Sequence, residues 1–183
     1  MDDLSVLYIA GYGRSGSTVL DVLLSGHPRV ASVGELVFLG NDWQDEDRKC
    51  ACGVPYENCL FWEGLFKDEA EVDSLEQIVR DVEHRHVLPK LLLGAHSEEK
   101  KREYRRRTRR LFEYIAQQGR ADLVVDSSKS ARQAAGRFWA LKNIAGLDVR
   151  VLHLVRDGRA ALRSVVEKGS NWALEGHTEE KRW

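Results

Sequence analysis

The sequence predicts an α/β fold, a P-loop-like parallel sheet flanked by helices with a mostly helical insertion. Three segments, at residues 6–10, 123–125 and 149–155, have the pattern of strands. The first two are the short apolar runs expected of strands that are covered on both faces. Each segment is followed by a polar or glycine-containing turn and then by a helical pattern. A repeated strand–loop–helix unit implies right-handed crossovers and therefore a parallel sheet.

The helices after these strands have clear stop signals. In chain order they are predicted over residues 18–25, 131–145 and 159–168. Each is followed by a glycine (Gly26, Gly146 and Gly169), the residue type that most often ends a helix. A further apolar run at residues 30–33 is predicted to return the chain to the edge of the sheet.

The middle of the chain has a different character, and we expect it to form the insertion, over about residues 42–120. It contains an acidic helical pattern at residues 68–83 and a strongly basic one at residues 98–118. The basic stretch could attract an acidic acceptor or a nucleic acid, but we expect a solvated helix that pairs with the acidic one. The whole chain, 1–183, is predicted to be one domain, and its last residues read as an opening helix without a stop, so truncation is expected there.

Composition excludes several classes of protein. The chain has 183 residues, of which 43% are hydrophobic and 31% charged, which rules out collagen-like, mucin-like and wholly disordered chains. With 28 Lys plus Arg against 29 Asp plus Glu, the net charge of −1 gives no argument for a nucleic-acid partner. No apolar run is long enough to span a bilayer, and the acidic start is unlike a secretory signal. We therefore expect a cytoplasmic protein without a membrane span, whose oligomeric state the sequence leaves open.

A glycine-rich loop follows the first strand, at residues 11–18. A loop between a strand and a helix N-terminus can cradle an anion with its backbone N–H groups. The residues expected to bind the anion are Arg14, Ser15, Gly16, Ser17 and Thr18. The spacing is that of a nucleotide-binding P-loop, except that Ser17 stands where a P-loop NTPase has its lysine. The alternative is a turn that only connects strand to helix.

A second anion site is predicted after the last strand. Arg156 follows this strand at the carboxyl edge of the sheet, where α/β proteins bind ligands. Ser164 lies eight residues further, about two helical turns on, so both side chains can face one phosphate. The alternative is that Arg156 and Asp157 form a pair that simply ends the strand.

Together these two motifs resemble the sulfotransferases that use 3′-phosphoadenosine 5′-phosphosulfate (PAPS). The loop Arg14-Ser15-Gly16-Ser17-Thr18 is similar to their 5′-phosphosulfate loop, and Arg156 with Ser164 is similar to their 3′-phosphate motif. The sequence Val-Arg-Asp-Gly-Arg-Ala at 155–160 most resembles the motif of the protein-tyrosine sulfotransferase branch and its bacterial relatives. In that branch a further basic residue contacts the nucleotide, a role that the resemblance assigns to Lys168.

The resemblance implies that PAPS is the co-substrate and that a sulfuryl group moves to a hydroxyl or amine acceptor. Such a transfer needs a base, cations that stabilise the moving sulfonate, and in-line positioning. Because the transferred sulfonate carries a single charge, no metal is required. The acceptor cannot be read from the sequence.

Three residues are the candidates for catalysis. Gly34-Glu35 matches a Gly-Glu pair that supplies the catalytic base in the tyrosine-sulfating branch; otherwise Glu35 caps a helix beginning at Leu36. Lys129, after the second clear strand, matches a lysine of the family that stabilises the departing phosphate. The sequence around it differs from that of better-known branches. The alternative is that Lys129 is a solvated loop lysine. Arg14 would stabilise charge on the sulfonate, and it can also pair with Asp21.

The three cysteines, Cys50, Cys52 and Cys59, are close together in sequence. Three thiolates could begin a zinc site, but a closed structural site needs four ligands and no histidine lies at a familiar spacing. A redox-sensitive pair is a further possibility, and buried free thiols packed near Trp62 are the expectation.

The sequence thus favours a PAPS-dependent sulfotransferase. One alternative is a P-loop kinase or NTPase, disfavoured by the missing lysine. The other is a non-catalytic nucleotide-binding remnant that kept the loops and lost turnover.

Overall fold

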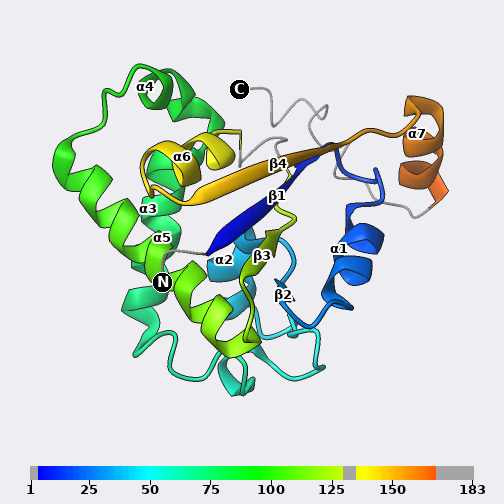
Figure 1. Cartoon of the computed structure of the whole chain (residues 1–183), viewed down its shortest axis with the longest axis horizontal. Coiled ribbons are helices and arrows are strands. Elements are labelled where there is room, and N and C mark those ends of the chain that lie inside the picture. The colour runs from blue at the N-terminus through cyan, green and yellow to red at the C-terminus, as the bar shows by residue number, and fades with distance from the viewer. Residues whose placement is uncertain (1–3, 130–134, 168–183) are drawn as a thin grey trace.

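The computed structural model describes residues 4–129 and 135–167, and within them the chain forms an α/β fold around one parallel sheet (Figure 1). The four strands are β1 (Ser5–Gly11), β2 (Val30–Ser32), β3 (Leu123–Asp126) and β4 (Asp148–Leu154). Their order in the sheet is β2-β3-β1-β4, and every pair is parallel. The predicted parallel sheet is therefore confirmed, with the run at 30–33 forming the edge strand β2.

Helices flank this sheet and fill the long stretch between β2 and β3. In chain order they are α1 (Ser17–Ser25), η1 (Leu36–Phe38), α2 (Leu39–Gln44), η2 (Tyr56–Asn58), α3 (Glu69–Glu83), η3 (Arg85–Val87), α4 (Leu88–Leu92), α5 (Glu98–Gly119), α6 (Arg137–Asn143) and α7 (Gly158–Glu167). Helix α5 contacts β2 and β3, α6 contacts β4, and α1 contacts β2. Helix α7 lies beyond the end of β4, at the right of Figure 1.

The central strand β1 explains why the sheet forms. It lies between β3 and β4, and its side chains Val6, Tyr8 and Ile9 are fully buried, as are Val124 and Val125 of β3. Burying apolar side chains on both faces is the main stabilising contribution in such a sheet, and β-branched residues suit its pleated surface.

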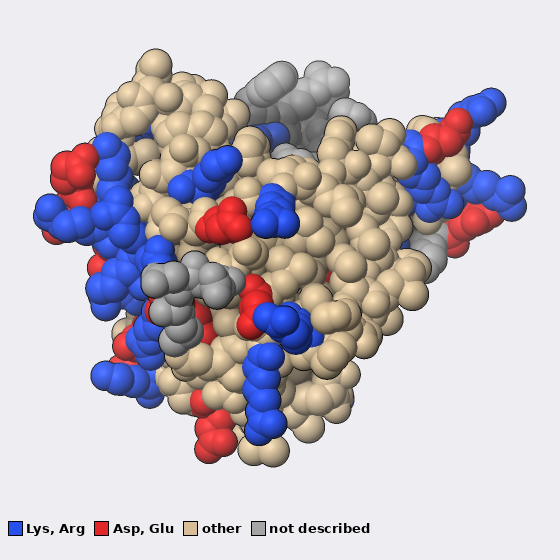
Figure 2. Space-filling model, in the orientation of Figure 1, with Lys and Arg blue, Asp and Glu red and all other residues tan. Residues whose placement is uncertain are grey.

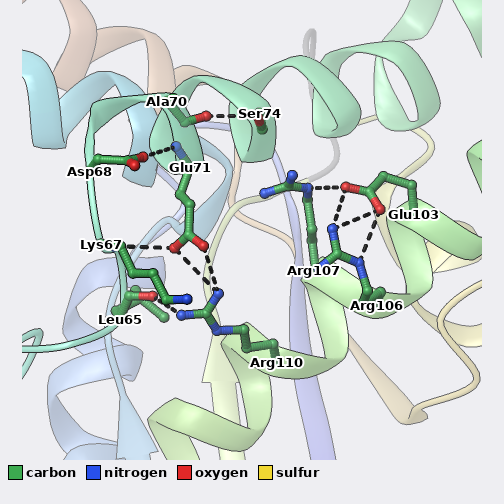
Figure 3. A network of polar contacts seen from close by, with 10 residues as sticks. All are labelled: Leu65, Lys67, Asp68, Ala70, Glu71, Ser74, Glu103, Arg106, Arg107 and Arg110. Carbon is green, nitrogen blue, oxygen red and sulfur yellow. Dashed lines mark hydrogen bonds and ion pairs between the residues drawn. The ribbon is translucent and has the colours of Figure 1, made fainter.

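The acidic and basic helices of the middle segment pair with each other, as predicted. Helix α3 begins at the N-cap Asp68 and α5 at the N-cap Ser97, whose side chains accept from backbone N–H groups in the first turn. Lys100 Nζ lies 2.6 Å from Asp81. Arg110 lies 3.3 Å from Glu71, and Figure 3 draws this second pair. On the face shown in Figure 2, Lys and Arg side chains gather over α5 and α7 with acidic side chains among them.

One helix differs from its prediction. The predicted helix 131–145 corresponds to α6, which starts only at Arg137, and residues 130–134 lie outside the described residues. The backbone N–H of Gly136, the N-cap of α6, donates to the carbonyl of Glu83, 2.9 Å away. This long-range hydrogen bond fixes the start of α6. Helix α7 agrees with its predicted range up to Glu167.

Gly11 is required where β1 and β4 end side by side. It pairs with Leu154, its φ is 147°, and a Cβ placed on it would lie 2.5 Å from the Leu154 carbonyl oxygen. We expect Gly11→Ala to lower the free energy of unfolding by about 1–3 kcal/mol, because the clash must be relieved by moving backbone. Chemical denaturation measures this loss.

Gly158→Ala is the matched control for this substitution. A Cβ at Gly158 would meet no atom within 4 Å, and the residue starts helix α7. Alanine there should be neutral or slightly stabilising. Equal stabilities of the two variants would show that the close approach at Gly11 is not a constraint.

Candidate functional site

Each strand of the sheet delivers one of the sequence-predicted residues to the same edge. Arg14 follows β1, Glu35 follows β2, Lys129 follows β3 and Arg156 follows β4. Because all four strands are parallel, these residues follow the carboxyl ends, the edge at which open α/β sheets bind ligands. The strand order places the Glu35 and Lys129 loops on neighbouring strands, and likewise the Arg14 and Arg156 loops.

The loop after β1 makes a tight turn, and anion binding by it stays a prediction. Arg14 has φ 67° and Gly16 has φ 98°, so two of the three residues 14–16 lie in the left-handed region. Arginine rarely adopts that conformation. Alternation of this kind turns successive N–H groups toward one point. Helix α1 starts at the buried Ser17, and Gly16, its N-cap, provides no side-chain cap. Ser15 is half-buried and Thr18 exposed at the same helix end.

Arg156 joins this loop to the loop after β4. Its Nη1 donates to the carbonyl oxygen of Arg14 at 2.9 Å, while the side chain stays exposed. Ser164 lies further along, half-buried on α7. The structure therefore brings Arg156 to the glycine-rich loop, and the predicted pairing of Arg156 with Ser164 on one phosphate stays a prediction. Lys168 lies outside the described residues.

Glu35 and Lys129, the two predicted catalytic residues in the loops after β2 and β3, contact each other directly. Lys129 Nζ donates to Glu35 Oε1, and the side chains are 14% and 36% exposed respectively. Glu35 precedes η1, but its carboxylate does not cap that helix. The alternative that Lys129 is a solvated loop lysine is also wrong, because its side chain is mostly buried and its amine contacts the carboxylate.

The backbone of Lys129 is held in an unusual conformation. Its φ is 61°, and its carbonyl oxygen accepts a hydrogen bond from the Tyr8 hydroxyl. Burial, together with the nearby Asp126 carboxylate, raises the pKa of Tyr8 well above its ordinary value, so this hydroxyl keeps its proton and donates. A left-handed non-glycine residue fixed by a buried partner is a common feature of functional sites.

Two further hydrogen bonds join the Glu35 loop to the Lys129 loop. The N–H of Ser127 donates to the carbonyl of Gly34 at 3.0 Å, and the N–H of Val37 donates to Ser128 Oγ at 3.0 Å. Ser128 is in turn bound through its own N–H to Asp126 Oδ1 at 3.0 Å. The acid and the amine are thus positioned by backbone contacts on both sides.

A buried ionic network lies beneath this loop. Arg137 Nε donates to Asp126 Oδ2 at 2.7 Å, and its Nη1 donates to both oxygens of Glu83 at 2.8 and 2.7 Å. Tyr104 completes the network by donating to Glu83 at 2.7 Å. All four side chains are at most 2% exposed. Burial works against the Arg137 charge, but Asp126 and Glu83 outweigh it and raise the pKa of the guanidinium.

Sequence reasoning missed this network and the role of Tyr8. The available signal was a charged residue on an otherwise apolar helix face: Glu83 follows Val79 by four positions on α3. A tyrosine inside an apolar strand gives no such signal, since it reads as core.

Asp21, the predicted alternative partner of Arg14, is engaged elsewhere. Its carboxylate accepts from the Ser32 hydroxyl on β2, and burial raises its pKa. The contact ties α1 to the edge strand of the sheet, which agrees with the packing of α1 on β2.

Comparison with known proteins adds no identification to this geometry. No family model matches the chain, and no curated protein or solved structure matches it either. Within residues 4–129 and 135–167, no helix has the length and apolar character needed to cross a membrane. A charged groove of about 560 Å³ lies between α3 and α5, lined by residues such as Glu76, Asp81 and Arg107, and it includes none of the candidate site residues.

Proposed function

We propose that this protein is a PAPS-dependent sulfotransferase that moves a sulfuryl group from PAPS to a hydroxyl or amine acceptor. The observation that carries the proposal is the direct contact between Glu35 and Lys129 at the carboxyl edge of the sheet. A carboxylate and an amine from the loops after two different strands meet there, on the β2–β3 side. The glycine-rich loop and Arg156 meet on the neighbouring β1–β4 side.

These positions suit the parts of the reaction. The nucleotide phosphates are placed on the β1 and β4 loops, where backbone N–H groups and Arg156 offer donors. Glu35 accepts the proton of the acceptor as the acceptor oxygen or nitrogen attacks sulfur. The bond between sulfur and the bridging oxygen breaks, and Lys129 donates to that oxygen as adenosine 3′,5′-bisphosphate leaves. Arg14 stabilises the sulfonate in transfer.

The contact with Lys129 supports assigning proton transfer to one oxygen of Glu35. Lys129 binds Oε1, so the second carboxylate oxygen is the one available to the acceptor. The same contact orients the amine, and the positioning of both groups before the substrate binds is what makes such a site effective.

Two other functions are distinguished from this proposal by two experiments. A P-loop kinase or NTPase would bind ATP, whereas a sulfotransferase prefers adenosine 3′,5′-bisphosphate, and thermal-shift titration with each ligand separates them. A non-catalytic nucleotide-binding protein would bind the bisphosphate but give no turnover of radiolabelled PAPS with any acceptor extract.

Arg156 provides a direct test of the nucleotide site. We expect Arg156→Ala to weaken binding of adenosine 3′,5′-bisphosphate by about 1.5–3 kcal/mol, because a charged hydrogen bond to phosphate is lost. The analogue without the 3′-phosphate should bind the parent weakly and the variant equally weakly. Isothermal titration calorimetry measures all four affinities.

Arg159→Ala serves as the control for this test. Arg159 belongs to the same Arg-Asp-Gly-Arg segment, but it is exposed and paired with Asp157 at 3.0 Å. Its removal should leave both affinities unchanged. If Arg156→Ala binds the two nucleotides as the parent does, the 3′-phosphate assignment is wrong.

A further inference from the structure

The three cysteines are free thiols, as expected, and their sulfurs converge on one point. Cys59 Sγ lies 3.3 Å from Cys50 Sγ and 3.4 Å from Cys52 Sγ, and all three sulfurs lie within 4.8 Å of one another. Cys59 is buried, Cys50 is half-buried and Cys52 is exposed. The group lies at the surface of the segment between α2 and α3.

The backbone around the thiols forms a compact turn that presents them together. The N–H of Cys50 donates to the carbonyl of Val54 at 2.9 Å, and the N–H of Gly53 donates to the carbonyl of Cys50 at 2.8 Å. Gly53 has φ 90°, a conformation that glycine adopts without strain. A bridge between Lys49 and Pro55 closes the base of the turn. These hydrogen bonds close the turn at residues 50–54 and hold Cys50 and Cys52 side by side.

Cys59 enters the cluster from the other direction, after η2. Its backbone N–H donates to the carbonyl of Tyr56 at 3.2 Å, and the N–H of Trp62 donates to the Cys59 carbonyl at 2.9 Å. The Tyr56 ring lies between Trp43 and Trp62, with ring centroids 6.3 Å from each. The third thiol is thus fixed by an aromatic cluster that also includes a side chain of α2.

We propose that Cys50, Cys52 and Cys59 form a zinc site. Sulfurs bound to one tetrahedral Zn²⁺ at about 2.3 Å lie about 3.8 Å apart, so small adjustments of these side chains accommodate the ion. Thiolate sulfur is the ligand type that zinc favours. In the described part of the chain no fourth His, Cys, Asp or Glu joins the group, and we assign the fourth position to a water molecule on the exposed side of Cys52.

Zinc binding by the three thiols requires no oxidant. Three thiols release three protons to solvent, and three sulfur–zinc bonds form, which leaves a site of net charge −1. A disulfide is the competing product, but it would pair only two of the three sulfurs and needs an oxidant to take two electrons. Cys59 lies equally near both partners, so the structure selects neither pair.

The zinc would brace the segment that leads away from Glu35. Glu35 is followed directly by η1 and α2, and α2 packs against η2 of the cysteine segment. The ion would cross-link the turn at 50–54 to Cys59 and hold η2 between them. This inference is independent of the proposed sulfotransferase activity.

Metal analysis of the full chain tests the site. Protein purified under reducing conditions and reconstituted with Zn²⁺ should retain about one zinc per chain after dialysis against a weak chelator. Cys52→Ser should lose it, and because Cys52 is exposed this variant leaves the core intact. Bound zinc should also protect the thiols from alkylation and raise the melting temperature of the parent but not of the variant.

A double variant, His84→Ala with His86→Ala, is the control. These two imidazoles stack with ring centroids 4.7 Å apart and are another pair of side chains in the middle segment that could bind zinc. Their removal should leave the zinc content unchanged. Cobalt substitution of the parent gives a readout that needs no variant, since thiolate–cobalt charge-transfer bands report the sulfur ligands.

Three results would overturn the proposal. The first is a reconstituted parent protein without zinc. The second is zinc retained by Cys52→Ser but lost from the histidine variant. The third is a chain whose intact mass is lower by two hydrogens after the same reducing purification and reconstitution, which would show a disulfide instead.

Discussion

Arg137→Met is expected to lower the free energy of unfolding by about 3–5 kcal/mol, because it leaves two buried carboxylates without their counter-charge. Asp126 and Glu83 are at most 1% exposed, and Arg137 donates to both. Methionine fills much of the same space, so the loss reports charge and not cavity formation. Urea denaturation followed by circular dichroism measures it.

Arg80→Met is the matched control, because it removes an arginine of the same protein from an exposed pair. Arg80 is 61% exposed and is paired with Glu76 one turn away on α3. We expect its loss to change the free energy of unfolding by less than about 0.5 kcal/mol, as is usual for surface ion pairs. A similar small change for Arg137→Met would mean that the network is not an ionic one.

Glu35→Gln is expected to reduce sulfuryl transfer by about 10²–10⁴-fold, the range that a positioned general base contributes. The amide keeps the shape of the carboxylate but cannot accept a proton, so the affinity for adenosine 3′,5′-bisphosphate should hold. The acidic limb of the pH–rate profile, if it belongs to Glu35, should disappear in the variant. Steady-state kinetics across pH give both readouts.

The contact between Glu35 and Lys129 makes a second outcome testable. Lys129→Ala should also slow turnover, through lost stabilisation of the leaving phosphate. Because each side chain orients the other, the double variant should lose less than the product of the two single losses. Glu46→Gln, at an exposed carboxylate of the loop after α2, should change nothing. Parental turnover and an unchanged acidic limb in Glu35→Gln would end the assignment.

Most of the secondary structure could be predicted because its signals are local. Apolar runs mark β1 and β3, and the N-caps Asp68 and Ser97 mark where α3 and α5 begin. The start of α6 could not be predicted, since it depends on a hydrogen bond between Gly136 and Glu83, more than fifty residues earlier in the chain. Such contacts exist only after the helical segment has packed on the sheet.

The candidate site could be predicted residue by residue but not as an assembly. Glu35 and Lys129 were each placed at the carboxyl edge from their position after a strand. Their contact required the strand order, which puts β2 next to β3 although the whole helical segment separates them in sequence. The three thiols show the same limit, because the turn that joins them is set by backbone hydrogen bonds around Gly53.

The buried network has a consequence for how this chain can be re-engineered. The helical segment between β2 and β3 is a continuous insertion in the chain, so it looks replaceable by a segment from another protein. Yet it supplies Glu83 and Tyr104, and these hold the arginine that anchors Asp126 at the end of β3. A segment grafted in its place must therefore supply a buried carboxylate that binds Arg137, as Glu83 does. If the grafted segment lacks such a carboxylate, Arg137 must be replaced as well.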